Sequence, residues 1–457
     1  MILFKTARFF LLIGLLYVAI VSPGTLFPFI VGKYSWFRVA VDIAAIAFLI
    51  GLMRDAKSEM FARIRSAFRE PLVIAVTVFV GVFLLAGFLG VDPAMSFFSN
   101  FERGEGGLQM LHLYAFFLLL VLLFRDEDGW HRLFRWALAG GALMALYGLC
   151  AGLDVGGFIG TRFSSPGFRF EGSIGNPAYV AAFSLFMLFY AAQLFFAKYW
   201  RRPFTPGGVT LMVLALAFLR VFFSAATRGA FLGLLAALVV GVGYFVYAHR
   251  AWRKWLLSGV VILLLVVGSL VYLKDSPFVK SIPGSRIFDI SFSANTFKDR
   301  AIMWKTAVDG WKERPLLGWG PENYIQVFDR RFNTAYFVPS RGFGAWFDRA
   351  HSIYFDYLAE TGALGLLSFL SIFVLFFVRL LTAWARVDRL ALQNARPHGT
   401  SPQPVGVGIV ASRAFLLAAL VAYLVQGVVL FDVLPIYVNV FIVLAFAVFE
   451  LQRLKER

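Results

Sequence analysis

His351 begins a stretch whose residue types and spacing could support acid–base chemistry. It is followed by Ser352, nine further residues, Gly362 and then Gly365, at the junction between a long polar segment and an apolar run. An imidazole titrates near neutral pH and can accept a proton from a hydroxyl group, so His351 is a candidate general base. The alternative is a histidine that makes only structural hydrogen bonds. Glu360 either supports this site or is a solvated residue before the glycines.

A group of arginines indicates a second chemistry, the binding of phosphate. The group comprises Arg103, Arg162, Arg169, Arg228 and Arg300. All lie in segments that the topology below places outside the membrane, where short loops are usually poor in basic residues. A guanidinium keeps its charge at any relevant pH, and its planar donors match phosphate oxygens. A surface role explains any one of them equally well, but the group as a whole favours a phosphate-bearing ligand.

The elements that must position these residues are membrane spans. Hydrophobic residues make up 60% of the 457-residue chain and charged residues 15%, whereas soluble proteins have about 25% charged residues. Long continuous apolar runs recur along the chain, unlike the alternating segments of a β-barrel. We therefore predict an all-α polytopic bundle of membrane helices. The net charge is +17, and most of the Lys and Arg residues lie in short loops between apolar runs. This distribution indicates that they set the membrane topology rather than bind nucleic acid.

The apolar runs predict about twelve spans. They lie at 9–31, 35–53, 71–90, 107–124, 131–153, 177–197, 208–226, 229–247, 255–273, 353–378, 408–431 and 434–451. Basic residues cluster in every second loop, and these clusters share one side if both termini are cytoplasmic. Lys5 and Arg8 precede an apolar run without a small-residue cleavage pattern, which indicates a retained first span.

The predicted organisation has three parts. Residues 1–273 contain spans one to nine, residues 274–352 form a large extracytoplasmic loop, and residues 353–457 contain spans ten to twelve. Within the loop, Thr296–Glu313 is predicted to be an amphipathic helix against the outer surface of the bundle, stopped by Pro315. Its apolar face is predicted from the helical spacing of Ala301, Trp304, Val308 and Trp311.

Three charged residues inside the predicted spans indicate a polar cavity. Arg38 and Asp42 are four residues apart on one helix face, and Arg220 lies in the seventh span. All three fall in the outer half of the bilayer under the predicted topology. Charge inside a membrane is costly and usually faces a partner or a water-filled cavity. We expect a cavity open to the outer leaflet, with a structural Arg38–Asp42 ion pair as the alternative.

Several motifs resemble the O-antigen ligase and polymerase superfamily, in order and in placement. The chain has His351-Ser352, then nine residues, Gly362, two residues and Gly365, and this spacing resembles the signature of that family. The further matches are Gly175-Asn176-Pro177, Thr227-Arg228-Gly229, Arg300 with Trp304, and Pro315–Gly320. The family's Gly-Asn-Pro motif usually continues with Asn, where this chain has Ala178. The matches span residues 169–365.

The resemblance implies a glycosyltransferase that moves a glycan from an undecaprenyl-type polyprenyl-diphosphate carrier to an acceptor hydroxyl. It implies a multi-pass protein of the bacterial inner membrane with its site facing the periplasm. His351 would be the base, and Arg228, Arg300, Arg169 and Arg103 would bind the diphosphate. Arg38, Asp42, Arg220, Asn176, Glu360, Gly362 and Gly365 are the supporting residues.

We expect an inverting reaction that needs no cofactor and no metal, because arginine can supply the positive charge. Glu102, Glu105 and Glu171 are conceivable metal ligands, but their spacing is weak evidence. The acceptor could be lipid A core in a ligase, another glycan in a polymerase, or a protein hydroxyl in an O-oligosaccharyltransferase. Membrane lipids are expected partners, and nucleic acid is not. A transporter of lipid-linked glycans or anions is the alternative from another class, although it predicts internal repeats, and none is visible.

Overall fold

The computed structural model describes residues 2–54, 59–150, 169–249, 252–282, 284–289, 295–334, 346–395 and 406–455. Within these ranges the chain forms helices and loops and no strand. The longer helices are α1 (Ile2–Gly14), α2 (Val31–Arg54), α4 (Pro71–Phe88), α6 (Gly107–Leu123), α7 (Glu127–Cys150), α8 (Pro177–Lys198), α9 (Pro206–Ala225), α10 (Arg228–Ala248), α11 (Arg253–Tyr272), α13 (Asn295–Glu313), α15 (Ile353–Ala395), α16 (Val407–Gln426) and α17 (Leu434–Lys455). The shorter elements are α3 (Glu59–Ala67), α5 (Pro93–Phe98), α12 (Pro277–Ser281), α14 (Tyr324–Arg330) and the 3₁₀ turns η1 (Leu15–Ala19), η3 (Gly172–Ile174) and η5 (Ser285–Phe288).

The predicted membrane spans are present as helices. In the described part of the chain, eleven helices are long and apolar enough to cross a membrane, and α6 is apolar but shorter, with 17 residues. This confirms the all-α polytopic fold. The first span differs from the prediction, because α1 and η1 cover residues 2–19 and the rest of that apolar run is a turn. Pro23 and Pro28 lack the amide hydrogens that would continue the helix.

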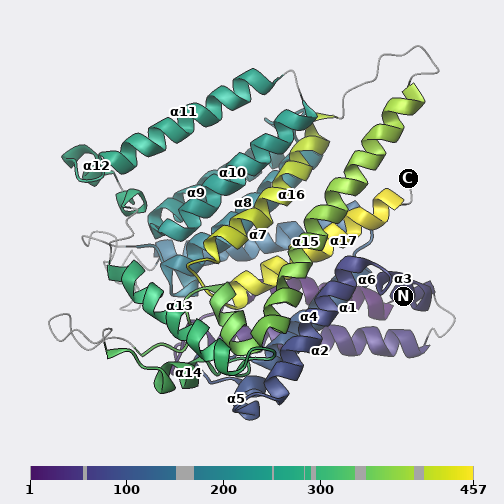
Figure 1. Cartoon of the computed structure of the whole chain (residues 1–457). Coiled ribbons are helices and arrows are strands. Elements are labelled where there is room, and N and C mark those ends of the chain that lie inside the picture. Colours follow the sequence, from purple (N-terminus) through teal and green to yellow (C-terminus); the bar gives the residue numbers. More distant parts are fainter. Residues whose placement is uncertain are drawn as a thin grey trace.

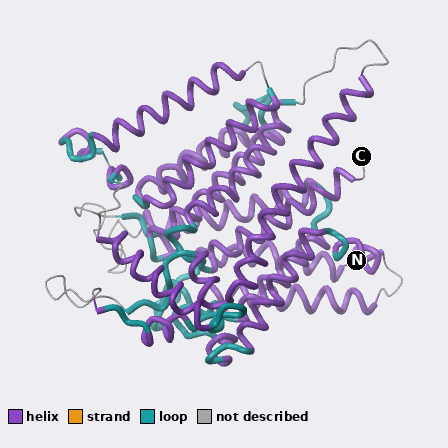
Figure 2. The backbone as a smooth tube through the Cα atoms, viewed as in Figure 1, coloured by secondary structure: helices purple, strands orange, loops and turns teal. Residues whose placement is uncertain are grey.

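The spans run side by side, and both termini lie at the same end of the bundle (Figure 1). α17 lies deepest, with 89% of its apolar window buried, whereas α11 has no buried residue and lies at the edge of the bundle. α10 packs along α16, and α8 lies against both α9 and α16. α5, α13 and α14 gather at the other end with much of the loop structure (Figures 1 and 2), here termed the loop end.

Two of the sequence motifs interlock at the loop end. Residues 315–320 run beside residues 359–364, and four backbone hydrogen bonds of 2.8–3.1 Å join them. The approach requires glycine on both sides. Gly362 has a φ of 65° and interrupts α15, and a Cβ there would lie 2.4 Å from the Leu316 backbone. Gly318 has a φ of 66°, and its Cβ would lie 2.5 Å from the Ala359 carbonyl oxygen.

The amphipathic helix of the large loop exists, but its buried face differs from the prediction. α13 covers Asn295–Glu313 and packs against α15 and α14. Its buried stripe is formed by Met303, Thr306, Ala307 and Gly310, while Ala301 is exposed. α13 is therefore rotated from the predicted Trp304–Trp311 face, because α15 and α14 cover a stripe that carries little hydrophobic signal in the sequence.

The glycine interlock predicts a large effect of a single methyl group. Gly362→Ala should lower the melting temperature of the purified protein, because alanine disfavours positive φ by about 1 kcal/mol and its methyl group would overlap Leu316. Gly259→Ala on α11 is the matched control, since a Cβ added at that position would have no other atom within 4 Å. Thermal unfolding in detergent checks the prediction, and equal melting temperatures for the two variants would contradict it.

Candidate active site

His351 lies in a tightly fixed turn immediately before α15. Its φ of 57° falls in the left-handed region, which residues other than glycine seldom adopt. The amide of Ala350 donates to Asp356 Oδ1 at 2.6 Å, and the amide of Ile353 donates to the carbonyl of Gly427 at 3.0 Å. The turn is thus attached both to the first turn of α15 and to the segment that follows α16.

The imidazole of His351 is held in one orientation and one tautomer. Nδ1 lies 3.2 Å from the carbonyl oxygen of Arg349, and because a carbonyl only accepts, Nδ1 carries the hydrogen. Phe347 and Phe431 contact the ring edge to face, each with its centroid 5.2 Å away. Nε2 is therefore left with its lone pair available, as a general base requires.

A buried ionic cluster anchors this turn through Arg349. The guanidinium contacts Glu322, lies 2.9 Å from Glu360 and 3.6 Å from Glu105, and the residue is only 6% exposed. Burial by itself lowers the pKa of Arg349, but these carboxylates more than offset it and raise the pKa above its usual value. Burial also raises the pKa of Glu105 to about 8. The cluster joins three segments that are distant in sequence.

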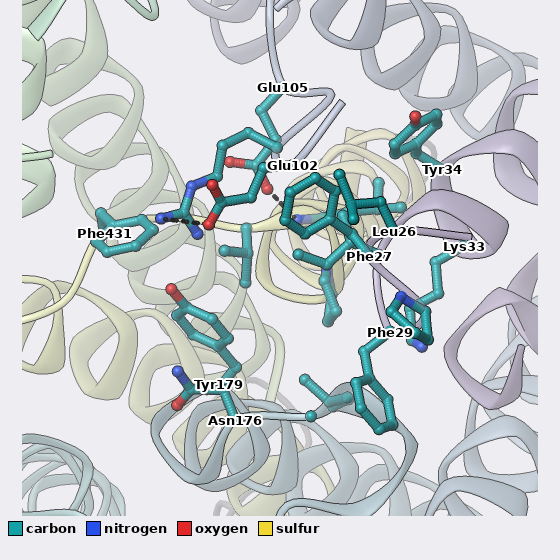
Figure 3. A pocket seen from close by; sticks show the side chains of 18 of the residues that line it. Leu26, Phe27, Phe29, Lys33, Tyr34, Glu102, Glu105, Asn176, Tyr179 and Phe431 are labelled. Atoms are coloured by element: carbon teal, nitrogen blue, oxygen red, sulfur yellow. Dashed lines mark hydrogen bonds and ion pairs between the residues drawn. The ribbon is translucent and has the colours of Figure 1, made fainter. Parts of the chain in front are cut away.

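A cavity of about 400 Å³ opens beside His351 and is termed the histidine cavity. Its polar wall contains Lys33, Tyr34, Glu102, Arg103, Glu105, Asn176 and Tyr179, and its apolar wall includes Phe27, Phe29 and Phe431. Tyr179 and Asn176 lie across the cavity from Glu102 and Glu105 (Figure 3). Aromatic faces combined with a few directed polar groups are suited to bind a ring that carries hydroxyl groups, such as a sugar.

A second cavity, of about 130 Å³, is lined by arginines and is termed the arginine cavity. Its cationic residues are Arg169, Arg228, Arg286 and Arg300. Arg228 pairs with Asp289 at 2.6 Å, and Arg169 donates to Thr227 Oγ1 at 2.8 Å. The Nε of Arg300 is buried and has no hydrogen-bond partner within the described ranges.

The arginine cavity concentrates positive charge. Burial first, and then the charges of Arg286 and Arg228, lower the pKa of Arg169 to about 10. Burial and then Arg228 likewise lower the pKa of Arg300. α10 begins at Arg228, and its first turn lines the cavity, so the positive end of the helix dipole adds to the field. A bound anion would relieve this repulsion.

The two cavities are neighbours, and His351 interacts with the charges of both. Ala178 lines the arginine cavity and Tyr179 the histidine cavity, so the start of α8 contributes to each. Burial lowers the pKa of His351, and the charges of Arg300 and Arg103 lower it further, partly opposed by the Arg349 carbonyl. The imidazole is therefore mostly neutral at pH 7.

The structure separates one predicted phosphate ligand from the other three. Arg169, Arg228 and Arg300 share the arginine cavity. Arg103 lies in the histidine cavity instead, where its guanidinium pairs with Asp348 at 2.7 and 3.1 Å and covers the ring of Phe431. Arg103 is thus largely engaged within the protein.

The charged residues of α2 have partners other than each other. Arg38 donates to Gln109 Oε1 at 2.8 Å and lies over the ring of Tyr34, which lines the histidine cavity. Asp42 lies 3.0 Å from Nε2 of His112 on α6. The alternative of an Arg38–Asp42 ion pair is therefore wrong, because α6 presents a separate partner to each residue.

The other predicted residues have mixed outcomes. Arg220 is exposed on α9, bonds Ser224 and lies outside both cavities; its long side chain extends toward the helix end rather than into a cavity. Asn176 caps α8 and also lines the histidine cavity. Glu360 is 4% exposed, so the alternative of a solvated residue is wrong. Arg162 lies outside the described residues.

Sequence reasoning missed Arg349 and Arg286. Arg349 stands two residues before His351, in a segment already rich in polar residues, so its burial left no signal. Arg286 lies in the same predicted outer loop as Arg300, and the rule that outer basic residues are informative could have identified it.

The acidic residues do not form an evident metal site. Among the described residues, no group of three or more His, Cys, Asp or Glu side chains is arranged to hold a metal ion. Glu105, one of the conceivable ligands, faces Arg349. Metal-independent chemistry stays a prediction.

Comparison with known protein families gives one match. Residues 211–370 match the sequence profile described as O-antigen ligase. This range includes Arg228, Arg300, His351 and Gly362, so the resemblance inferred from the motifs is confirmed over this part of the chain. No curated protein sequence matches the chain.

The ionic cluster predicts that Arg349 is essential for stability. Arg349→Ala should reduce the free energy of unfolding by about 3–5 kcal/mol, because it leaves buried carboxylates without their cation. Lys305→Ala, which removes a 71% exposed side chain from an exposed ion pair, should change it by less than about 1 kcal/mol. Denaturant unfolding in micelles measures both, and similar values for the two variants would rule out this role of the cluster.

Proposed function

Because the chain carries an O-antigen ligase domain over residues 211–370, we propose that it is a membrane glycosyltransferase that moves a glycan from a polyprenyl-diphosphate carrier to an acceptor hydroxyl. The observation that carries the proposal is the position of an oriented, neutral His351 next to a cavity with four arginines. His351 supplies a base, and the arginines supply positive charge for a diphosphate leaving group.

The arginine cavity is suited to the donor diphosphate. A diphosphate brings several negative charges, and Arg169, Arg286 and Arg300 have no described ion-pair partner that would compete with it. The charge on the bridging oxygen grows as the glycosidic bond breaks, and fixed guanidinium groups stabilise that charge without reorganising. Arg300, whose Nε lacks a hydrogen-bond partner among the described residues, offers an unused donor for a phosphate oxygen.

The histidine cavity is suited to the acceptor. In the proposed reaction, the acceptor oxygen attacks the anomeric carbon, and the bond from that carbon to the phosphate oxygen breaks. The hydroxyl proton moves to Nε2 of His351, and the electron pair of the broken bond leaves on the polyprenyl diphosphate. A single displacement inverts the anomeric centre. The aromatic wall of the cavity supports a sugar as acceptor, as in a ligase or polymerase, more than a protein hydroxyl.

We place the site on the periplasmic side of a bacterial inner membrane. Both termini lie at the end of the bundle away from α13 and α14 (Figure 1), and the basic residues of alternate loops are assigned to that end by the positive-inside rule. Cysteine-accessibility labelling of introduced residues from either side of the membrane tests this orientation.

A transfer assay tests the function. The purified protein, given a polyprenyl-diphosphate glycan and a glycan acceptor, should form product in the presence of a metal chelator. His351→Ala should lower kcat by roughly 10²- to 10⁴-fold, the usual contribution of a general base. His249→Ala, at the far end of α10, should leave the rate unchanged.

The results of this assay distinguish the proposed transferase from its alternatives. Full activity of the His351→Ala protein would refute the role of the base. A protein that moves the lipid-linked glycan across vesicles but forms no product would be a transporter. The product itself separates the variants of the function, because a polymerase lengthens the glycan whereas a ligase attaches it once.

The pH profile provides an independent check of His351. A base must be neutral to accept a proton, and a lowered pKa keeps it neutral to a lower pH. The acid limb of kcat/KM, which reports the free enzyme, should therefore lie below about pH 6.5, the value of an unperturbed histidine. Arg300→Gln removes a charge that lowers the pKa of His351, so it should move that limb to higher pH, whereas Arg300→Lys should not. An acid limb that is identical in both variants would contradict the assignment.

A further inference from the structure

Lys33 places a buried positive charge in the wall of the histidine cavity. It lies in the first turn of α2, is only 3% exposed and lines the cavity. Its Nζ donates to the carbonyl oxygens of Ile20 and Ser173, each at 2.6 Å. In the described part of the chain no carboxylate pairs with this ammonium. Because an ammonium has three donors, one donor and the formal charge are left without a partner there, and a buried charge in that state is costly.

The two glutamates of the histidine cavity do not supply the missing counter-charge. Glu102 lies 3.6 Å from Arg103, and Glu105 lies 3.6 Å from Arg349. In Figure 3, Lys33 lies apart from both glutamates. Burial also raises the pKa of Glu105 to about 8, so this carboxyl group is largely protonated at pH 7. The wall around Lys33 is therefore positive.

Three helix N-termini add to this positive field. The first turns of α2, α8 and α17 contribute Tyr34, Tyr179 and Leu434, respectively, to the lining of the histidine cavity. The N-terminus of a helix carries about half a unit of positive charge, because the peptide dipoles align along the axis. The helix ends and the ammonium together favour a negatively charged group in this cavity.

We propose that Lys33 binds an anionic group of the acceptor glycan, a carboxylate or a phosphate, in the histidine cavity. This inference rests on the proposed function, which places the acceptor beside His351. The free donor of the ammonium would bind one oxygen of that group in a charge-assisted hydrogen bond. A lysine is a compact point charge that accepts either anion, whereas the forked guanidinium groups of the arginine cavity match a diphosphate. The acceptor is accordingly an acidic glycan.

Lys33 also joins two parts of the cavity wall. Its hydrogen bonds to Ile20 and Ser173 attach the turn before α2 to η3. Loss of these bonds alone would loosen the wall and weaken the binding of every acceptor to the same extent. The test therefore varies the charge of the acceptor together with the residue.

The experiment uses the acceptor isolated from the native membrane in three forms. One form is untreated, one has its phosphate monoesters removed by phosphatase, and one has its carboxylates reduced to alcohols. For the wild-type protein, one of the two treatments should raise KM for the acceptor roughly tenfold, a change of about 1.4 kcal/mol, and that treatment identifies the anion. KM for the donor should not change.

Substitution of Lys33 should remove this preference. Lys33→Met should raise KM for the untreated acceptor roughly tenfold and leave KM for the form without the anion unchanged. Lys33→Gln, whose amide still offers donors to the wall, should show the same pattern and replaces Lys33→Met if that protein does not fold. Lys198→Met, at the other end of α8, is the matched control, because Lys198 lines no described cavity and pairs only with Asp128 at the surface.

The outcomes separate this inference from the function on which it rests. Unchanged wild-type KM values after both treatments would overturn the anion site and leave the transferase intact. Equal increases for treated and untreated acceptor in the Lys33 variants would also overturn it, because Lys33 would then act only on the wall. An increase in KM for the donor alone would assign the charge to the donor instead. Failure of the wild-type protein to use any acceptor would reject the transferase and the anion site together.

Discussion

The buried charge of Arg349 is the interaction on which the loop end depends. Glu105, Glu322 and Glu360 come from separate segments, and each is expensive to bury without a cation. One guanidinium offsets this cost for all of them, so the segments before α6 and α14 and the start of α15 must meet at one point. The backbone carbonyl of the same residue accepts from His351 Nδ1. Stability and the orientation of the candidate base therefore have a common origin.

The loop end holds charges of both signs near His351. Glu105, Glu322 and Glu360 surround Arg349, two residues before His351, and Arg300 belongs to the arginine cavity. Burial and the arginines favour the neutral imidazole before reaction. In the proposed reaction the incoming diphosphate would neutralise the arginine field, which eases protonation of the imidazole as the acceptor attacks. Donor binding would then raise the pKa of His351.

The sequence was sufficient for features set by long patterns and insufficient for those set by single contacts. Apolar runs predicted the spans, and the helical spacing of apolar residues before Pro315 predicted α13, because such patterns average over many residues. The first span ends earlier than its apolar run because Pro23 and Pro28 cannot continue a helix. The partners of Arg38 and the exposure of Arg220 depend on which helices are neighbours. The motif resemblance predicted that Arg169, Arg228 and Arg300 bind one ligand, and the three do line one cavity. Arg286 and Arg349 were recognised only through tertiary contacts.

The turn at His351 also explains why the candidate base is not on a helix. A helical side chain would be fixed to one face of one span, whereas the left-handed turn places the imidazole in the histidine cavity, which shares the start of α8 with the arginine cavity. A membrane transferase has to bring a lipid-bound donor and a separate acceptor to one point from different directions. A strained residue is stable there because Asp356, Gly427 and the Arg349 cluster hold it from three sides. Backbone strain at His351 is therefore the expected consequence of placing one base in the histidine cavity and near the charges of its neighbour.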